Sequence, residues 1–223
     1  MIIMLRKINL LLLTISIVIM TGCSEDFLET KPTNAIAAGD ALATADNMFL
    51  VLAGLHRQMY AQPQIPGGDN TRSGEHYFIP LGDNITGGLI HSANSNNLGW
   101  ISEAQWVSHT LPTSATVEQL WYQRYHFIAS SSAIINEIAK GSIVVDSDVS
   151  NILGQSYAYR AWAYYQLITH YAKGYLIGNP STDPGVPLQL GSVSPYQSGP
   201  RVTVAKIYEQ MEDDINEAIT HFE

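Results

Sequence analysis

Residues 148–172 read DVSNILGQSYAYRAWAYYQLITHYA, and this stretch decides the fold. Its apolar residues repeat at three- and four-residue steps, which is the spacing of one face of an α-helix. That face holds Leu153, Tyr157, Ala161, Tyr164, Ile168 and Tyr171. Trp162 and Tyr165 lie on another side of the same predicted helix. Because a helix that is apolar on most of its circumference is packed on several sides, we expect residues 148–172 to be the central helix.

A second predicted helix precedes the central one. Residues 116–139 carry an apolar stripe at helical spacing, and Thr116 with Gln119 has the spacing of a capping box. Gly141 is placed to end this helix. A connection of about eight residues then leads into residues 148–172, so the two helices are expected to form an antiparallel hairpin of tetratricopeptide-like size. The strict tetratricopeptide consensus is missing, so any repeat is degenerate.

Two more helices are expected nearer the ends of the chain. Residues 41–61 show helical periodicity, with Thr44 or Asp46 as the N-cap. A last helix starts near Thr203, and its apolar face is still running at the final residue. We therefore expect that the natural protein continues and that this chain is an N-terminal portion. No segment alternates in the manner of a clear strand, so the predicted fold class is all-α.

The segment 62–115 differs in character from the helices around it. It is rich in Gly, Asn, Ser and Pro, and no period persists along it. A long irregular stretch inside a compact domain is uncommon and is usually functional. The sequence thus predicts an all-α, tetratricopeptide-like scaffold with a long irregular loop region.

The N-terminus has the pattern of a bacterial lipoprotein signal. Arg6 and Lys7 precede an apolar run over residues 8–20, and Gly22 is followed by Cys23, the one Cys of the chain. This pattern predicts a signal peptide over 1–22 with lipid attached at Cys23 after cleavage. A polar tether would follow over 23–40 and the helical domain over 41–223. The alternatives are an ordinary secreted protein with a stray thiol, or a short anchor helix.

Composition excludes several classes of protein. The formal charge is −9, and loss of Arg6 and Lys7 with the signal would make it more negative. An acidic chain without basic runs is a poor binder of nucleic acid. With Cys23 lipidated, no thiol remains for a disulfide or a thiolate metal site.

Enzyme motifs are absent from the sequence. Seven His are scattered without metal-ligand spacing, and the chain has no nucleophile elbow, phosphate-binding loop or dinucleotide fingerprint. Sequence alone leaves open a pair of carboxylates for glycoside hydrolysis, but acidic residues are sparse in the loops. We therefore predict a protein that is not an enzyme and has no cofactor or metal.

Four landmarks resemble one known family. In order they are Cys23–Pro32, Ala45–Tyr60 with its Gly54-Leu55-His56-Arg57, Gln155–Tyr171 followed by Pro184–Leu188, and Arg201–Ala218. Together they resemble the N-terminal part of SusD/RagB-like proteins, which are surface glycan-binding lipoproteins of Gram-negative bacteria. Members of that family are typically more than twice as long as this chain.

The resemblance implies a function at the outer membrane. A surface-exposed, lipid-anchored protein would capture oligosaccharide or polysaccharide without cleaving it, and would sit as a lid on a TonB-dependent transporter barrel. The first competing hypothesis is a helical-repeat scaffold that binds peptide or protein in envelope assembly or peptide uptake. The second is a lipid-anchored glycosidase.

Sugar recognition needs aromatic rings to stack on sugar faces and amides or carboxylates to bond hydroxyl groups. The irregular segment holds both kinds of group, and Trp100 beside the Asn cluster is the leading candidate. The complete candidate set is Trp100, Asn97, Asn96, Tyr77, Asp83 and Trp106. Alternatively, Trp100 and Trp106 could anchor the loop to the helices, and the residues 94–97 could form a turn.

Other conspicuous residues have structural interpretations. Trp121 and Trp162 lie on predicted helix faces and should belong to the core. Arg160 lies in an apolar helix, so we expect it to form a structural ion pair. The acidic residues of the last helix, Glu209, Glu212, Asp213, Asp214 and Glu217, are expected to form its solvated face.

Overall fold

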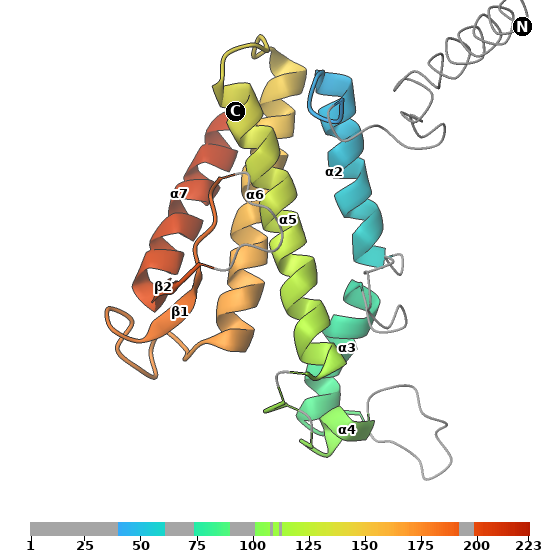
Figure 1. Ribbon diagram of the computed structural model, residues 1–223, viewed down its shortest axis with the longest axis vertical. Coiled ribbons are helices and arrows are strands. Elements are labelled where there is room, and N and C mark those ends of the chain that lie inside the picture. Colours follow the sequence, from blue (N-terminus) through green and yellow to red (C-terminus); the bar gives the residue numbers. More distant parts are fainter. Residues whose placement is uncertain (1–39, 61–73, 90–100, 108, 112, 192–198) are drawn as a thin grey trace, which may run out of the picture. The chain divides into compact units, whose positions relative to one another are not determined.

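A computed structural model describes residues 40–60, 74–89, 101–107, 109–111, 113–191 and 199–223. The predicted signal peptide, Cys23 and nearly all of the tether lie outside these residues, as do Asn96, Asn97 and Trp100. The described helices are α2 (Ala45–Tyr60), α3 (Glu75–Ile85), α4 (Ile101–Ala104), α5 (Ala115–Ala139), α6 (Ser147–Tyr171) and α7 (Val204–Phe222). The described part of the chain is mostly helical, which confirms the all-α prediction (Figure 1). None of its helices is both long enough and apolar enough to span a bilayer.

Helices α5 and α6 form the predicted antiparallel hairpin (Figure 1). Gly141 has a left-handed φ of 77°, and its N–H donates to the Ile138 carbonyl where α5 ends. The carboxylate of Asp146 then accepts the Val149 N–H and caps α6. Helix α6 packs against α2, α5, α7 and the strand β1 (Pro184–Pro187), so it is central, as its apolar circumference predicted.

The capping box predicted at Thr116 and Gln119 is wrong. The residue before α5 is Ser114, and Thr116 lies inside the first turn of the helix. Gln119 lies further along the same helix and is buried. The Thr116 hydroxyl instead donates to the carboxylate of Glu103 in α4, so a tertiary contact takes the place of the local one.

Helix α2 begins after Thr44, one of the two caps predicted for it, and α7 begins after Thr203, close to its predicted start. The Thr44 hydroxyl accepts the Asn47 N–H ahead of α2, and the Thr203 hydroxyl accepts the Lys206 N–H at the start of α7. A two-stranded antiparallel sheet, β1 with β2 (Arg201–Thr203), precedes α7. The sequence did not predict these strands because both are too short to show alternation. β1 has four residues, two of them prolines, and β2 has three.

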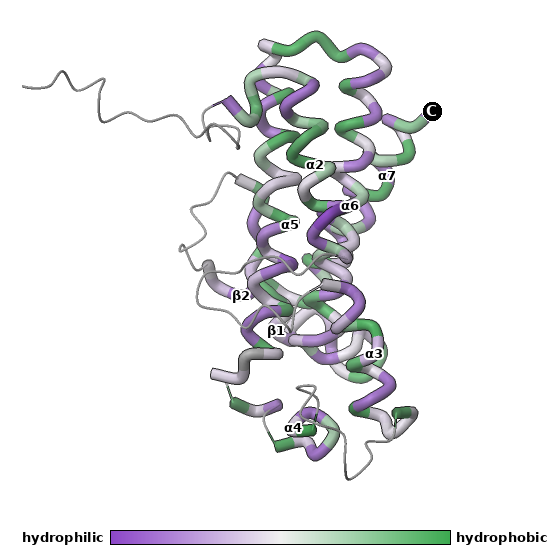
Figure 2. The backbone as a smooth tube through the Cα atoms, turned by 90° about the vertical axis from the view of Figure 1, so that its right-hand side faces the viewer, coloured by the Kyte–Doolittle hydropathy of each residue, from purple (hydrophilic) through white to green (hydrophobic). Residues whose placement is uncertain are grey.

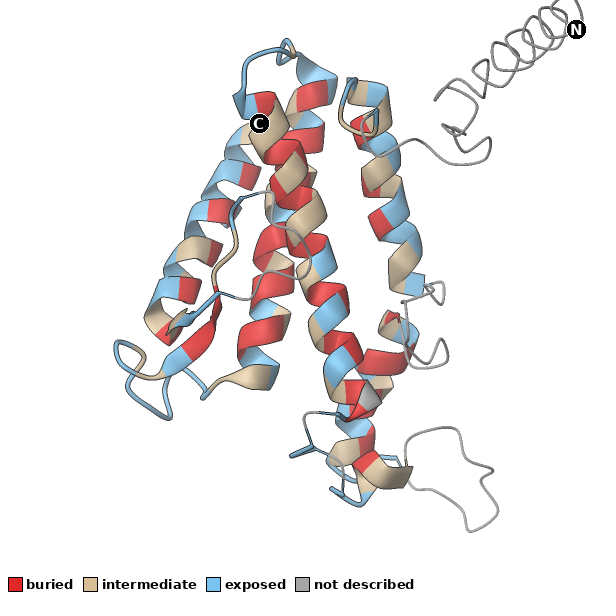
Figure 3. Cartoon of the chain, viewed as in Figure 1, coloured by how far each residue is buried: buried red, intermediate tan, exposed pale blue. Residues whose placement is uncertain are grey.

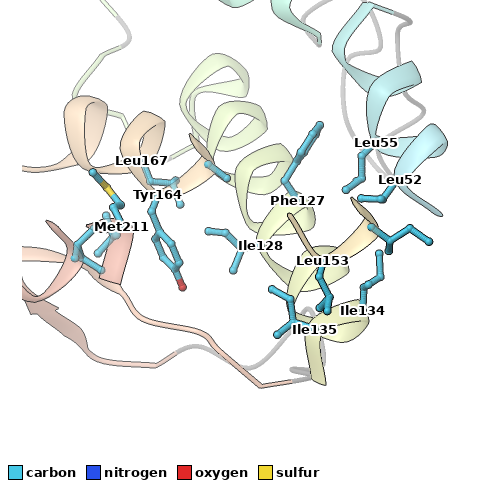
Figure 4. Close-up of a cluster of buried hydrophobic side chains, with 14 of the residues drawn as sticks. Leu52, Leu55, Phe127, Ile128, Ile134, Ile135, Leu153, Tyr164, Leu167 and Met211 are labelled. Atoms are coloured by element: carbon cyan, nitrogen blue, oxygen red, sulfur yellow. The ribbon is translucent and has the colours of Figure 1, made fainter. Parts of the chain in front are cut away.

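One main core joins α2, α5, α6, β1 and α7 (Figures 3 and 4). Hydrophobic and hydrophilic stretches alternate along the backbone of these helices (Figure 2). Fully buried members include Leu52, Phe127, Ile128, Tyr164 and Leu167. Burying a large apolar side chain stabilises a fold by about 1.5–3 kcal/mol, so this shared core is the main source of stability.

A buried ion pair crosses the α6–α7 seam. Arg160 donates from Nε to Asp214 Oδ2 at 2.9 Å and from Nη2 to Asp214 Oδ1 at 2.6 Å. Gln210 Nε2 donates to the same carboxylate, and Ser132 accepts from Arg160 Nη1. The structural role predicted for Arg160 is thus confirmed. Asp214 is only 1% exposed, so the prediction that the whole acidic run is solvated is wrong at this residue.

The segment predicted to be irregular contains two helices. Helix α3 has 11 residues with Pro80 inside, and α4 has only four. Pro80 has no N–H to donate within the helix. Gly74, just before the helix, and Gly82, within it, are residues typical of loops. The helix was therefore not predicted, and its apolar face is short, with Tyr77, Phe78 and Leu81 buried and Ile85 partly buried.

Candidate functional site

Helix α3 rests on the start of α5 through a second, smaller core. Tyr77, Phe78 and Leu81 of α3 pack with Leu120 of α5. Tyr171, near the end of α6, lies against the edge of the same cluster. This cluster packs α3 directly against the α5–α6 hairpin.

A chain of hydroxyl and carboxyl groups joins α3, α4 and α5. The Tyr77 hydroxyl lies 3.1 Å from Thr116 Oγ1, and Thr116 donates to Glu103 Oε1. Ser102 Oγ donates to Glu103 Oε2 at 3.0 Å. Glu103 is only 7% exposed, and a buried carboxylate is tolerated when such donors surround it. These bonds position the short α4 beside α3.

Helix α3 ends in a turn that requires glycine. Gly87 has a φ of 82°, in the left-handed region that side chains disfavour, and its N–H donates to the Asn84 carbonyl. The Thr86 hydroxyl donates to the Gly82 carbonyl at 2.9 Å. The turn leads the chain back over the end of α3, where Leu89 N–H donates to the Asp83 carbonyl.

An open hollow of about 430 Å³ lies between this turn and α4. Its lining combines amide, hydroxyl and backbone groups with short apolar surfaces. The lining residues are Asn84, Ile85, Thr86, Gly87, Leu89, Ile101, Ala104 and Gln105. None of these carries a charge. The described part of its lining therefore offers hydrogen bonds and apolar contact, and contains no carboxylate or imidazole for acid–base chemistry.

Trp106 stands beside the hollow. Its indole Nε1 donates to the carbonyl of Ile85, a lining residue, at 3.2 Å. Its side chain is 54% exposed, and its ring meets His109 edge to face. Its φ of 57° is unusual for a bulky residue, and such backbone strain persists at functional sites when surrounding contacts hold it. Trp106 thus anchors the segment and also keeps half of its surface in solvent.

The described candidate residues separate into three environments. Trp106 adjoins the hollow, and Asp83 is exposed on the last turn of α3 beside it. Tyr77 is 3% exposed, so its ring is part of the small core and its hydroxyl of the polar chain. The three remaining ligand candidates, Trp100, Asn96 and Asn97, lie outside the described residues.

Sequence reasoning missed the lining residues Thr86, Gly87 and Gln105. The one signal for the first two was the Thr-Gly-Gly run after Asn84-Ile85.

A second hollow, between α6 and α7, has a different character. It measures about 350 Å³ and is lined almost entirely by apolar groups. Its lining consists of Ala158, Ala161, Trp162, Tyr165, Met211, Ile215, Ala218, Ile219 and Phe222. Trp162 and Trp121 both pack against the main core, as predicted. A surface with so few polar groups suits an apolar partner and not a polyhydroxylated one.

Groups that could hold a metal do not gather in the described part of the chain. No three His, Cys, Asp or Glu side chains within it come together at a distance that would bind an ion. The uncharged lining of the α3–α4 hollow agrees with this observation. The arrangement can bind a neutral ligand that is rich in hydroxyl groups.

The fold is a helical hairpin scaffold with an open hollow between the turn after α3 and α4. The chain matches a family model over residues 26–222, and that SusD-like family is described as starch-binding and associating with the outer membrane. Because the match covers most of the chain, the protein belongs to the SusD-like family. No curated protein matches the chain.

Crystal structures of SusD superfamily proteins share the fold. One from Bacteroides vulgatus is 19% identical with a TM-score of 0.56, over 79% of this chain and 37% of that one. One from Bacteroides thetaiotaomicron is 20% identical with a TM-score of 0.56, over 80% and 37%. A candidate sugar-binding protein from Bacteroides vulgatus is 16% identical with a TM-score of 0.59, over 78% and 36%. This chain therefore spans little more than a third of their length.

Proposed function

We propose that this protein binds oligosaccharide or polysaccharide without cleaving it. The observation that carries the proposal is the α3–α4 hollow, which is open to solvent, has no charged group among its described lining residues and is bordered by a half-exposed Trp106. Amides and backbone groups would bond sugar hydroxyls, with water bridging some contacts, and the indole would cover an apolar sugar face. Membership of a family described as starch-binding supports this choice of ligand.

The setting that we propose is the outer membrane. Lipid on Cys23 would tether the chain at the cell surface, and the bound glycan would pass to a TonB-dependent transporter barrel. The family description, which includes association with the outer membrane, supports this setting. Incorporation of labelled palmitate into the wild type but not into Cys23→Ser tests the anchor. Equal labelling of both would exclude it.

Glycan binding is tested by calorimetry and affinity electrophoresis of the full polypeptide against soluble starch and a panel of other polysaccharides. We expect Trp106→Ala to weaken binding about tenfold, since loss of a stacked aromatic ring costs on the order of 1.4 kcal/mol. Phe222→Ala is the matched control, because both side chains are 54% exposed and Phe222 lines the apolar hollow on α6 and α7. A folded wild type that binds no glycan would exclude the proposal. Equal losses in the two variants would exclude Trp106 from the site.

The apolar hollow on α6 and α7 favours a second candidate function, a helical-repeat scaffold that binds a peptide. Ile215, Ile219 and Phe222 are each about half exposed there. Glu212 is exposed on α7 and lines the adjoining surface with Tyr208, so the partner that fits is an apolar peptide with basic residues. Phe222→Ala would then weaken peptide binding, and Trp106→Ala would leave it unchanged.

A further inference from the structure

Arg124 on α5 is buried beneath α3. Its side chain is 0% exposed, although Arg is almost never fully buried unless it is paired. Nη1 lies 2.6 Å from Oε1 of Glu75, the first residue of α3. The guanidinium also lies between two rings, with Cζ 4.3 Å from the centroid of Trp162 and 5.3 Å from that of Phe78. One side chain thus contacts α3 twice and α6 once.

The pairing of Arg124 is unusually sparse. Within the described part of the chain, none of its Nε, Nη1 and Nη2 atoms makes a hydrogen bond of good geometry, so the close contact with Glu75 is an ion pair. Burial lowers the pKa of Arg124, and the nearby carboxylate of Glu75 opposes that shift. By contrast, Arg160 on α6 has a bidentate carboxylate partner and a bond to Ser132. The stability of the buried Arg124 charge therefore depends on the first turn of α3 remaining in place.

We propose that Arg124 is a positioning residue for the α3–α4 hollow. It clamps the start of α3 to the α5–α6 hairpin, and the last turn of that same helix supplies Asn84 and Ile85 to the hollow. Because Glu75 and the lining residues Asn84 and Ile85 belong to one 11-residue helix, displacement of its first turn would also displace its last turn. The inference rests on the proposed glycan site, but the clamp itself can be measured without any glycan.

The two partners should respond differently to substitution. Glu75 is 20% exposed and can be hydrated when Arg124 is replaced, whereas Arg124 has no access to water when Glu75 is replaced. Arg124→Met keeps much of the apolar stem between the two rings, so the hairpin retains its packing. Glu75→Gln leaves a buried cation with a weaker partner. Arg124→Met should therefore release α3 without unfolding the rest, and Glu75→Gln should also lower the melting temperature.

The primary test is hydrogen exchange of the full polypeptide, followed by mass spectrometry. In Arg124→Met we expect exchange within Tyr77–Ile85 to accelerate about tenfold or more, with little change in α6 and α7. Arg124→Lys keeps the charge and should fall between Arg124→Met and the wild type. Lys206→Met, which breaks the exposed pair with Glu209 on α7, is the control and should leave α3 unchanged.

The second arm measures the affinity for soluble starch by calorimetry. We expect the Kd to rise about tenfold in Arg124→Met and less in Arg124→Lys, at a melting temperature close to that of the wild type. Unchanged exchange in α3, or equal acceleration in α3 and α6, would overturn the clamp. Faster exchange in α3 with unchanged affinity would overturn its positioning role. If the wild type binds no starch or other glycan, the proposed function fails, and the exchange data alone decide the clamp.

Discussion

The α5–α6–α7 scaffold and the α3–α4 region are held together by different kinds of contact. In the scaffold, apolar stripes run the length of each helix, and the buried Arg160–Asp214 pair is surrounded by hydrogen bonds. In the α3–α4 region, a small cluster around Leu81 is supplemented by single polar contacts through Arg124 and Thr116. A segment that buries few apolar contacts has a low free energy of local unfolding. The scaffold therefore sets the stability of the protein, and the region that bears the hollow is the part able to adjust.

Breaking the ion pair of the scaffold should have the largest effect. Asp214→Ala leaves the buried Arg160 without its carboxylate, and removal of one partner of a buried pair costs about 3–5 kcal/mol. Urea denaturation followed by circular dichroism measures the loss. Asp213→Ala is the matched control, because Asp213 is exposed on the same helix and should change stability by no more than about 0.5 kcal/mol. Equal effects of the two substitutions would show that Asp214 is not buried with Arg160.

A pair of leucine truncations should separate the two regions. Leu167→Ala opens a cavity in the main core, where Leu167 is 0% exposed, and should cost about 2–5 kcal/mol of global unfolding free energy. Leu81→Ala removes a side chain of the same size from the small cluster, where local opening of α3 limits the global loss. Native-state hydrogen exchange should show faster exchange in α3 alone for Leu81→Ala. Global losses of equal size would indicate that the two regions unfold as one unit.

The sequence predicted the scaffold well because the same periodic pattern specifies each helix and its partner. Gly141 and Thr203 marked helix ends through local chemistry that depends on a few neighbouring residues, whereas the sequence analysis did not identify Asp146 as the cap of α6. Asp214 shows the limit of this reasoning: its neighbours Glu212 and Asp213 are exposed, and only the position of Arg160 on another helix makes it a core residue. Buried charges are specified by tertiary pairing, which a helix pattern does not contain.

The site was less predictable because tertiary contacts build it. Trp106 was selected as a ring near polar residues, but its bond to the Ile85 carbonyl joins residues 21 positions apart. Thr116 looked like a helix cap, and its hydroxyl instead serves Glu103 and Tyr77. Short helices such as α3 carry too few apolar residues to show a helical period. The residues that line the hollow were therefore hard to identify from the sequence.

Alkaline pH should weaken the scaffold through Tyr164. Its hydroxyl donates to the Gln189 carbonyl at 2.9 Å, and burial raises its pKa above the value near 10 of an unfolded chain. The unfolded state therefore loses the proton first, and the stability contributed by Tyr164 is present below pH 10 and falls as the pH rises above it. Between pH 10 and 11 the wild type should lose about 1 kcal/mol more than Tyr164→Phe, measured by urea denaturation at each pH. Parallel losses in the two proteins would show that the hydroxyl ionises equally well in the folded state.

Substitutions at two glycines test the backbone of α2 against that of the turn after α3. Neither Gly54 in α2 nor Gly87 after α3 has an atom within 4 Å of an added Cβ, so packing does not distinguish them. Gly54 is helical and exposed, and Gly54→Ala should stabilise the protein by about 0.5–1 kcal/mol because Ala loses less backbone entropy on folding. Gly87 has a φ of 82°, so Gly87→Ala should destabilise by about 1–2 kcal/mol. Gly87→Asn should cost less than Gly87→Ala, since Asn tolerates left-handed backbone. Melting temperatures of the three variants provide the measurement, and a gain in stability from Gly87→Ala would mean that the turn bordering the hollow does not have the left-handed conformation.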